Sequence, residues 1–236
     1  MNKKQVDNGW PITAERFVAF IDIMGFKDLI MRSTHNQVYK MMRTINEQRR
    51  HNADIQWLGI TEKLIRTMTY SDSIMIYSKD DSTKSFDSIS NTISGLSYDL
   101  FIEGIPHKGA LAFGTMTIDS EDSIFFGQPL IDSYLLQEEL SFYGVLLHGS
   151  VEKKIYSSKY DIGGLFIKDY ICPLKNGASH HLTIFPMFLD ESENSKYKQN
   201  QKELFEAIIK FRHGTSGHLR KYIDNTENYF KFISSS

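Results

Sequence analysis

Residues 17–26 read FVAFIDIMGF, and two signals meet in this run. Phe17 to Ile21 is a short apolar stretch rich in strand formers, which predicts a buried β-strand. Asp22 stands at the end of that stretch. Gly25 then supplies a break before apolar residues recur at helical spacing. A carboxylate between a buried strand and a glycine break is a first candidate functional group.

A second acidic residue lies in a turn between two extended runs. Residues 57–70 lead through an alternating pattern to Ser71-Asp72-Ser73, and residues 74–77 form a short apolar run behind it. Two extended runs joined by a short polar turn predict a β-hairpin with Asp72 at or beside its tip.

The remaining pattern predicts the order β-α-α-β-β-α-β-α-β. A first helix is expected after Gly25, a second one ends at about residue 50, and two more lie at 82–103 and 128–140. Strands are expected at 108–118, 144–148 and 182–188. This order resembles an α+β, ferredoxin-like split βαββαβ core, a sheet with helices on one face. Residues 150–176 are expected to mix loop and strand. We divide the chain into an N-terminal arm (1–14), a core domain (15–190) and a two-helix C-terminal extension (191–236).

Composition and charge narrow the class of protein. The chain has 236 residues, 27 Lys and Arg against 29 Asp and Glu, and a formal net charge of −2. This balance argues against a protein held on nucleic acid or on a membrane by bulk positive charge. The single cysteine, Cys172, excludes an internal disulfide framework. No apolar run is long enough to span a bilayer and the N-terminus lacks a signal-peptide pattern, so we expect a soluble cytoplasmic protein.

The two aspartates predict a functional site when they are considered as a pair. In a split βαββαβ sheet the first strand and the hairpin are neighbours, so Asp22 and Asp72 are expected to meet. Two carboxylates at such a short separation destabilise a fold unless a cation lies between them. Oxygen ligands of this kind suit Mg²⁺ or Mn²⁺. Taken singly, Asp22 as a helix cap and Asp72 as an ordinary turn residue are the more common roles. The pair on adjacent strand ends favours metal.

These residues resemble motifs of the class III nucleotide cyclases. Residues 20–26 (Phe-x-Asp-Ile-x-Gly-Phe) are similar to their first-strand motif, and residues 70–75 are similar to their hairpin motif. Residues 107–114 resemble their Arg-x-Gly strand, residues 127–131 the glycine that opens their next helix, and residues 172–177 a late lysine-bearing turn. The resemblance covers about residues 15–190.

The resemblance implies a metal-dependent cyclase whose ribose 3′-oxygen attacks the α-phosphorus of a nucleoside triphosphate. Two Mn²⁺ or Mg²⁺ ions per site would be held by Asp22, Asp72 and the carbonyl of Ile23. Backbone N–H groups up to Gly25 and Phe26 would cradle the terminal phosphates, and Lys175 would add positive charge, with Lys108 as the second candidate. The resemblance also implies a head-to-tail homodimer with its sites at the interface.

The positions at which this sequence differs from the family motifs concern recognition of the nucleotide base. Strand alternation places Arg66, Met68, Tyr70 and Asp72 on one face. Met68 stands where a purine cyclase has its base-reading residue, and the Asn and Arg expected on the helix after Gly127 fall on Ile131 and Leu135. Base contacts are expected from Arg66, Met68 and Tyr70, and from Tyr134 of the partner subunit.

This pattern resembles the compact pyrimidine cyclases of bacterial antiphage signalling, the Pycsar type. The implied product is a cyclic pyrimidine nucleotide, cUMP from UTP in preference to cCMP from CTP, read by a separate cyclic-nucleotide-responsive effector. Two alternatives stay open. One is a purine cyclase with an unusual base pocket, and the other is a catalytically dead cyclase-like module that binds nucleotide or dimerises.

Overall fold

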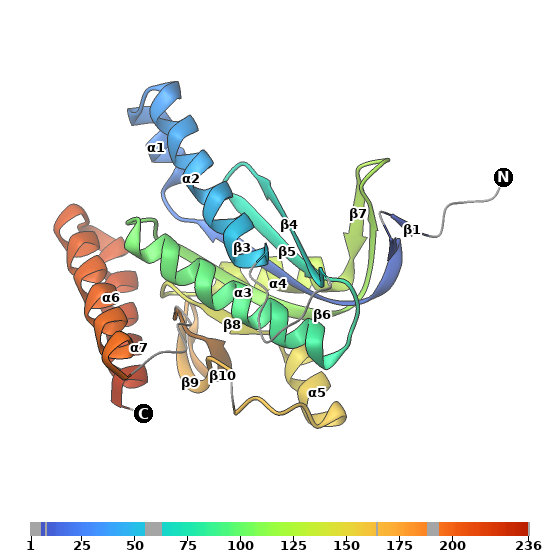
Figure 1. Cartoon of the computed structure of the whole chain (residues 1–236). Coiled ribbons are helices and arrows are strands. Elements are labelled where there is room, and N and C mark those ends of the chain that lie inside the picture. Colours follow the sequence, from blue (N-terminus) through green and yellow to red (C-terminus); the bar gives the residue numbers. More distant parts are fainter. Residues whose placement is uncertain (1–5, 8, 55–62, 164, 188–193, 236) are drawn as a thin grey trace.

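A mixed β-sheet organises the chain (Figure 1). The computed structural model describes residues 6–7, 9–54, 63–163, 165–187 and 194–235. The sheet has the strand order β4-β5-β3-β6-β8-β10-β9, with β7 paired to β6, and β1 and β2 form a separate small sheet. The strands are β1 (Val6–Asp7), β2 (Trp10–Pro11), β3 (Thr13–Ile23), β4 (Ile65–Tyr70), β5 (Ser73–Ser78), β6 (His107–Asp119), β7 (Ile124–Gly127), β8 (Val145–Leu147), β9 (Ile167–Leu174) and β10 (Gly177–Ile184). The helices are α1 (Phe26–Arg32), α2 (His35–Asp54), α3 (Thr83–Ile102), α4 (Gln128–Glu139), α5 (Gly149–Ser158), α6 (Asn194–Gly214) and α7 (Arg220–Ser235).

The predicted split βαββαβ core is confirmed. Strand β3 lies between β5 and β6 and is antiparallel to both, and β4 forms the outer strand of the β4–β5 hairpin. Helices α1 and α2 connect β3 to β4, and α3 connects β5 to β6. The start of the first hairpin run near Trp57 and the boundary expected at 190/191 lie outside the described residues.

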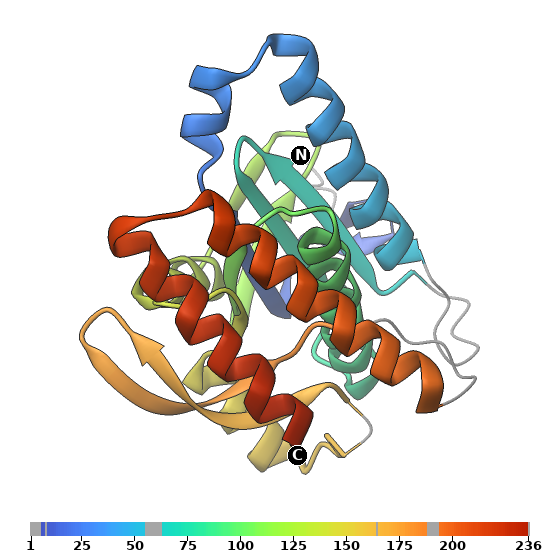
Figure 2. The same cartoon turned by 90° about the vertical axis from the view of Figure 1, so that its left-hand side faces the viewer.

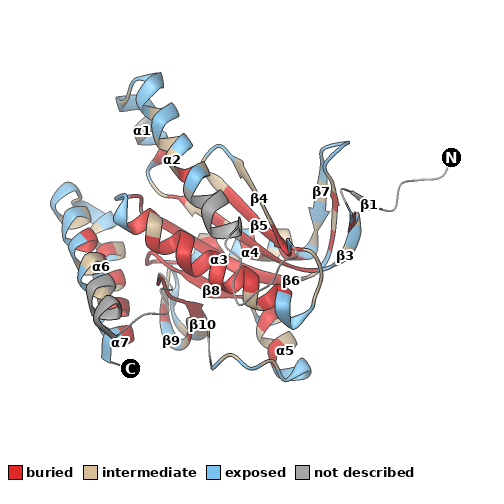
Figure 3. Ribbon diagram, in the orientation of Figure 1, coloured by how far each residue is buried: buried red, intermediate tan, exposed pale blue. Residues whose placement is uncertain are grey.

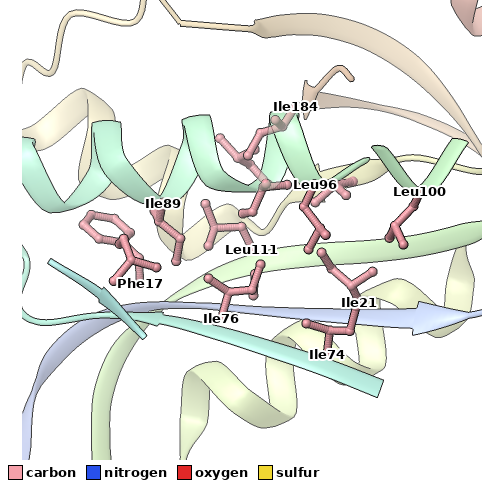
Figure 4. Close-up of a cluster of buried hydrophobic side chains, with 14 of the residues drawn as sticks. Phe17, Ile21, Ile74, Ile76, Ile89, Leu96, Leu100, Leu111 and Ile184 are labelled. Atoms are coloured by element: carbon pink, nitrogen blue, oxygen red, sulfur yellow. The ribbon is translucent and has the colours of Figure 1, made fainter. Parts of the chain in front are cut away.

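One face of β3 forms the main core. Side chains alternate along a strand, so Phe17, Ala19, Ile21 and Ile23 point together toward α3 and are buried there. Figure 4 shows Phe17 and Ile21 facing Ile89, Leu96 and Leu100 of the helix. Helix α3 is buried along almost its whole length, as the red ribbon of Figure 3 shows.

The opposite face of the sheet is not bare. The expectation of helices on one face only is wrong, because α4 packs on β3 and β6 from the other side. Phe20 of β3 meets Tyr134 of α4 edge-to-face, with ring centroids 5.4 Å apart. Leu130 packs beside Val18 and Met116 in a second apolar cluster. Strand β3 is therefore covered on both faces along part of its length, as its near-continuous apolar sequence requires.

The C-terminal extension is confirmed as two helices, and both pack into the core. Figure 2 shows α6 and α7 side by side, in orange and red. Phe230 of α7 contacts Phe101 of α3, and the Tyr229 hydroxyl lies 2.7 Å from the hydroxyl of Thr183 in β10. No described helix has the length and apolarity needed to cross a membrane.

Three local predictions differ from the structure. The polar residues 1–14, with Gly9 and Pro11, predict a loose arm, but its end is packed on the core: Trp10 is buried beside Tyr77, and β3 already begins at Thr13. Strand β7 was not predicted. Residues 149–158 form helix α5, although we expected loop and strand. Only Val151 and Ile155 of that helix are buried, so its apolar signal is short.

Candidate active site

The ends of β3 and of the β4–β5 hairpin meet at one edge of the core. Asp22 is paired in register with Ser73, the first residue of β5. One residue further, the Ile23 N–H donates to the main-chain oxygen of Asp72 at 2.8 Å. Ser71 takes a positive φ of 55°, which closes the turn between β4 and β5. The two predicted aspartates are thus neighbours through main-chain pairing.

The environment of Asp22 penalises its charge. The side chain is half-buried. Loss of water contact on burial, with smaller contributions from the charges of Asp72 and Glu138, raises the pKa of Asp22 to about 6, while the Lys108 ammonium opposes the rise. An ionised Asp22 beside Asp72 therefore lacks full compensation from the protein itself.

Lys108 and Glu138 lie near Asp22, and Lys175 joins them through Glu138. Lys108 of β6 is paired in register with Asp22 on the side away from Ser73, and it is only 3% exposed. Its ammonium lies 3.6 Å from Glu138 Oε1. Lys175, in the turn between β9 and β10, places its ammonium 3.5 Å from Glu138 Oε2. Burial lowers the pKa of Lys108, and the charges of Glu138 and Asp22 counteract this.

The donor set fits a hard divalent cation that keeps several ligands from substrate or water. Asp22 and Asp72 supply carboxylate oxygens, and the carbonyl of Ile23 faces the hairpin because its N–H does so. Within the described residues, no three His, Cys, Asp or Glu side chains are placed to hold a metal ion together. Such a sparse set suits Mg²⁺ or Mn²⁺ bound partly through phosphate oxygens, and not a closed protein cage.

The proposed base-contacting residues separate along the hairpin. By strand pairing, Tyr70, Met68 and Arg66 lie on the Asp22 face of the sheet, whereas Asp72 lies in the turn and not on the strand. Tyr70 is 81% exposed beside that turn. Met68 packs against the second apolar cluster. Arg66 lies over the ring of Trp10, 4.1 Å from its centroid, near the far end of β4.

The other predicted residues lie as follows. Gly25 takes a φ of +77°, a conformation that favours glycine, and turns the chain into α1. The side chain of Phe26 is buried in the main core, so only its main chain can face a ligand. Tyr134 is half-exposed and contacts Phe20 of its own chain.

Sequence reasoning missed Glu138. It lies in the last turn of α4, far along the chain from both aspartates, and no motif in the sequence includes it. The side chain reaches the site because the N–H of Lys175 donates to the carbonyl of Glu139 at 2.7 Å, which ties the β9–β10 turn to the end of α4. A signal existed in the buried position of Lys108, since a buried lysine requires an acidic partner.

Comparisons with known proteins gave similar solved structures only. No family model and no curated protein matches the sequence. One similar structure is the catalytic core of a rhodopsin-guanylyl cyclase with converted specificity in complex with ATPalphaS. It is 12% identical, with a TM-score of 0.49, over 73% of this chain and 96% of that chain. Another is a class III adenylyl cyclase-like ATP-binding protein from Pseudomonas aeruginosa, 15% identical, with a TM-score of 0.42, over 60% of this chain and 35% of that chain.

Proposed function

We propose that this protein is a metal-dependent nucleotide cyclase that converts a pyrimidine nucleoside triphosphate into its 3′,5′-cyclic monophosphate and pyrophosphate. The observation that carries the proposal is the main-chain bond from Ile23 to Asp72, which makes the chain at Asp72 a neighbour of Asp22, itself paired with the buried Lys108. A carboxylate pair that needs a cation, next to ammonium groups that need an anion, suits a metal–polyphosphate substrate.

The reaction needs few protein groups. The ribose 3′-oxygen forms a bond to the α-phosphorus, the bond to the β-phosphate bridging oxygen breaks, and the hydroxyl proton passes to water. Divalent cations, when bound, would activate the 3′-hydroxyl and neutralise charge on the leaving group. Asp22, Asp72 and the Ile23 carbonyl would hold them, the main chain at Gly25 and Phe26 would border the terminal phosphates, and Lys175 would add positive charge. Fixing one ring-closing conformer supplies the entropic part of the rate.

Pyrimidine preference, UTP before CTP, rests on the sequence of the hairpin. Met68 is a partly buried apolar residue where purine cyclases carry a polar base-reading side chain. Tyr70 is exposed beside the aspartates and has a face on which a base can stack. Arg66 is engaged by Trp10, so we assign it no base contact.

A homodimer would complete the site. Helix α4 exposes Ile131, Tyr134 and Leu135, and Tyr70 is exposed on the hairpin. Apolar and aromatic side chains left in solvent are typical of a surface that a partner covers. Burial of these residues against a second copy would bring Tyr134 of one subunit toward the nucleotide of the other.

The test is a product assay on the full chain. The protein is incubated with ATP, GTP, CTP and UTP in turn with Mn²⁺, and cyclic products are resolved by chromatography and mass. We expect cUMP as the main product and its loss in Asp22→Ala and Asp72→Ala. Asp122→Ala, an exposed aspartate in the β6–β7 turn, is the matched control. Turnover that survives in the Asp22 and Asp72 variants would contradict the shared metal site.

The same assay separates the alternatives. A purine cyclase gives cAMP or cGMP, and a catalytically dead module gives no cyclic product from any nucleotide. The proposed biological role is a second messenger in antiphage defence, read by a separate effector that binds the cyclic nucleotide. A neighbouring gene that encodes such an effector, activated by cUMP in a reconstituted mixture, would support that role.

A further inference from the structure

Glu138 lies between two ammonium groups at the edge of the candidate active site. One of its carboxylate oxygens is 3.6 Å from Lys108 Nζ, and the other is 3.5 Å from Lys175 Nζ. The amide of Gln137 also donates to Oε1 of Glu138 at 2.9 Å. Asp22 lies in register with Lys108 on the neighbouring strand. Each lysine therefore shares the one glutamate as its ion-pair partner in these contacts.

The three side chains differ in freedom. The Lys108 side chain is 4% exposed and comes from β6, an inner strand of the sheet, so its ammonium is held in place. The Glu138 side chain is 42% exposed at the end of α4, and the Lys175 side chain is 45% exposed in a turn. Glu138 and Lys175 form a partly exposed, weak ion pair, so Glu138 can leave Lys175 at little cost, and it can leave the buried Lys108 when another anion takes its place.

An anion held between two ammonium groups has the surroundings of a phosphate oxygen. Charge-assisted hydrogen bonds from lysine serve carboxylates and phosphates alike, and a polyphosphate brings more charge than one carboxylate. Asp22, one of the two aspartates proposed to bind metal, is paired in register with the same lysine, so a phosphate here would lie near the cation that accompanies it.

We propose that Glu138 occupies a phosphate position between Lys108 and Lys175 in the substrate-free protein and that the polyphosphate of the substrate displaces it. The identity of the ligand as a nucleoside triphosphate rests on the proposed function. Glu138 is then a competing anion that sets substrate affinity. It also compensates the charge of Lys108 whenever the site holds no ligand.

Binding of inorganic tripolyphosphate without divalent metal tests this displacement directly. Titration calorimetry on the full chain at low salt is carried out for the unmodified protein, Glu138→Gln and Glu139→Gln. Glu139 is exposed on the next residue of α4, and its contact with Lys175 is through main-chain atoms, so Glu139→Gln changes the net charge equally while that main-chain bond stays in place. We expect Glu138→Gln to bind tripolyphosphate roughly three- to tenfold more tightly, and Glu139→Gln to stay within about twofold of the unmodified protein.

The lysines are tested in the Glu138→Gln background. Lys175→Met, a turn substitution that leaves the core intact, should lose at least the gained affinity, and Lys108→Met should do the same with its melting temperature recorded. Equal or weaker binding by Glu138→Gln than by Glu139→Gln overturns the inference and makes Glu138 a residue that positions the lysines. Absence of tripolyphosphate binding in every variant also overturns it. The cyclase assay with Mn²⁺ is a separate measurement. If the binding data show that tripolyphosphate displaces Glu138 but no cyclic product forms, only the proposed function is rejected.

Discussion

Replacing Asp22 with asparagine is expected to stabilise the metal-free protein while abolishing catalysis. Burial and the neighbouring charge of Asp72 raise the pKa of Asp22 to about 6 from 3.8. The folded state therefore favours the protonated carboxyl and penalises the ionised one. Asparagine has nearly the shape of the protonated acid and carries no charge, so it removes the penalty.

The size of the effect follows from the two pKa values. At 1.36 kcal/mol per unit of pKa, the difference between about 6 and 3.8 sets an upper limit of about 3 kcal/mol, and solvent screening of this half-buried carboxyl reduces the expected effect to about 1–2 kcal/mol at pH 8. The stability that the protonated carboxyl provides is fully present below pH 3.8 and is lost as the pH rises through 6. The advantage of Asp22→Asn should therefore vanish near pH 4 and be complete above pH 7. For a chain of this length, about 1–2 kcal/mol corresponds to a rise in melting temperature of roughly 2–8 °C.

Urea unfolding in EDTA at pH 8 and at pH 4.5 measures this prediction, with Asp122→Asn as the exposed control. Adding Mn²⁺ at pH 8 gives a second readout, because a cation that binds only the folded state should stabilise the unmodified protein and not Asp22→Asn. A variant that is less stable than the parent at pH 8, or a gain that does not change with pH, would refute the electrostatic account of the site.

Three further predictions concern the second aspartate, the glycine break and the C-terminal helices. Asp72→Asn should abolish both cyclic product and the stabilisation by Mn²⁺, while the free energy of unfolding in EDTA changes by no more than about 0.5 kcal/mol, because the residue lies in a turn; a response to Mn²⁺ equal to that of the parent would count against a shared metal. Gly25→Ala places a side chain at a φ of +77° and should cost about 1 kcal/mol in the same unfolding assay; no loss would show that the turn relaxes. Phe230→Ala should cost about 3–5 kcal/mol, since the ring is 3% exposed and packs on Phe101, whereas the control Tyr156→Ala, at a residue 77% exposed, should change little; equal effects would remove the case that α7 belongs to the core.

The meeting of Asp22 and Asp72 could be predicted because strand pairing fixes it. Residues 17–21 form a continuous apolar run, and residues 64–77 form an alternating pair of runs around one turn. A hairpin whose apolar face must join the same core as β3 has few possible registers, since a slip of one residue would turn its apolar side chains to the other face. The observed pairing of Asp22 with Ser73 is the register that this constraint leaves.

The contact between the two lysines and Glu138 could not be predicted from the sequence in the same way. Their contact depends on how far α4 extends and where the β9–β10 turn docks against it, and the main-chain bond from Lys175 to Glu139 fixes both. Neither feature has a periodic signal. Helix α5 was missed for a related reason, since its formation depends on packing of Val151 and Ile155 against the sheet more than on local pattern.

The arrangement of charges explains why the site is costly without its ligands. Ionised Asp22 lies near Asp72 and Glu138; the buried ammonium of Lys108 offsets Asp22, and Lys108 and Lys175 together offset Glu138. A metal would relieve the aspartates, and a polyphosphate would relieve Lys108 in place of Glu138. Each ligand therefore binds more favourably once the other is present, because each removes a charge that the other leaves uncompensated. Binding of tripolyphosphate should accordingly tighten when Mn²⁺ is added to the unmodified protein, and this coupling should disappear in Asp22→Asn.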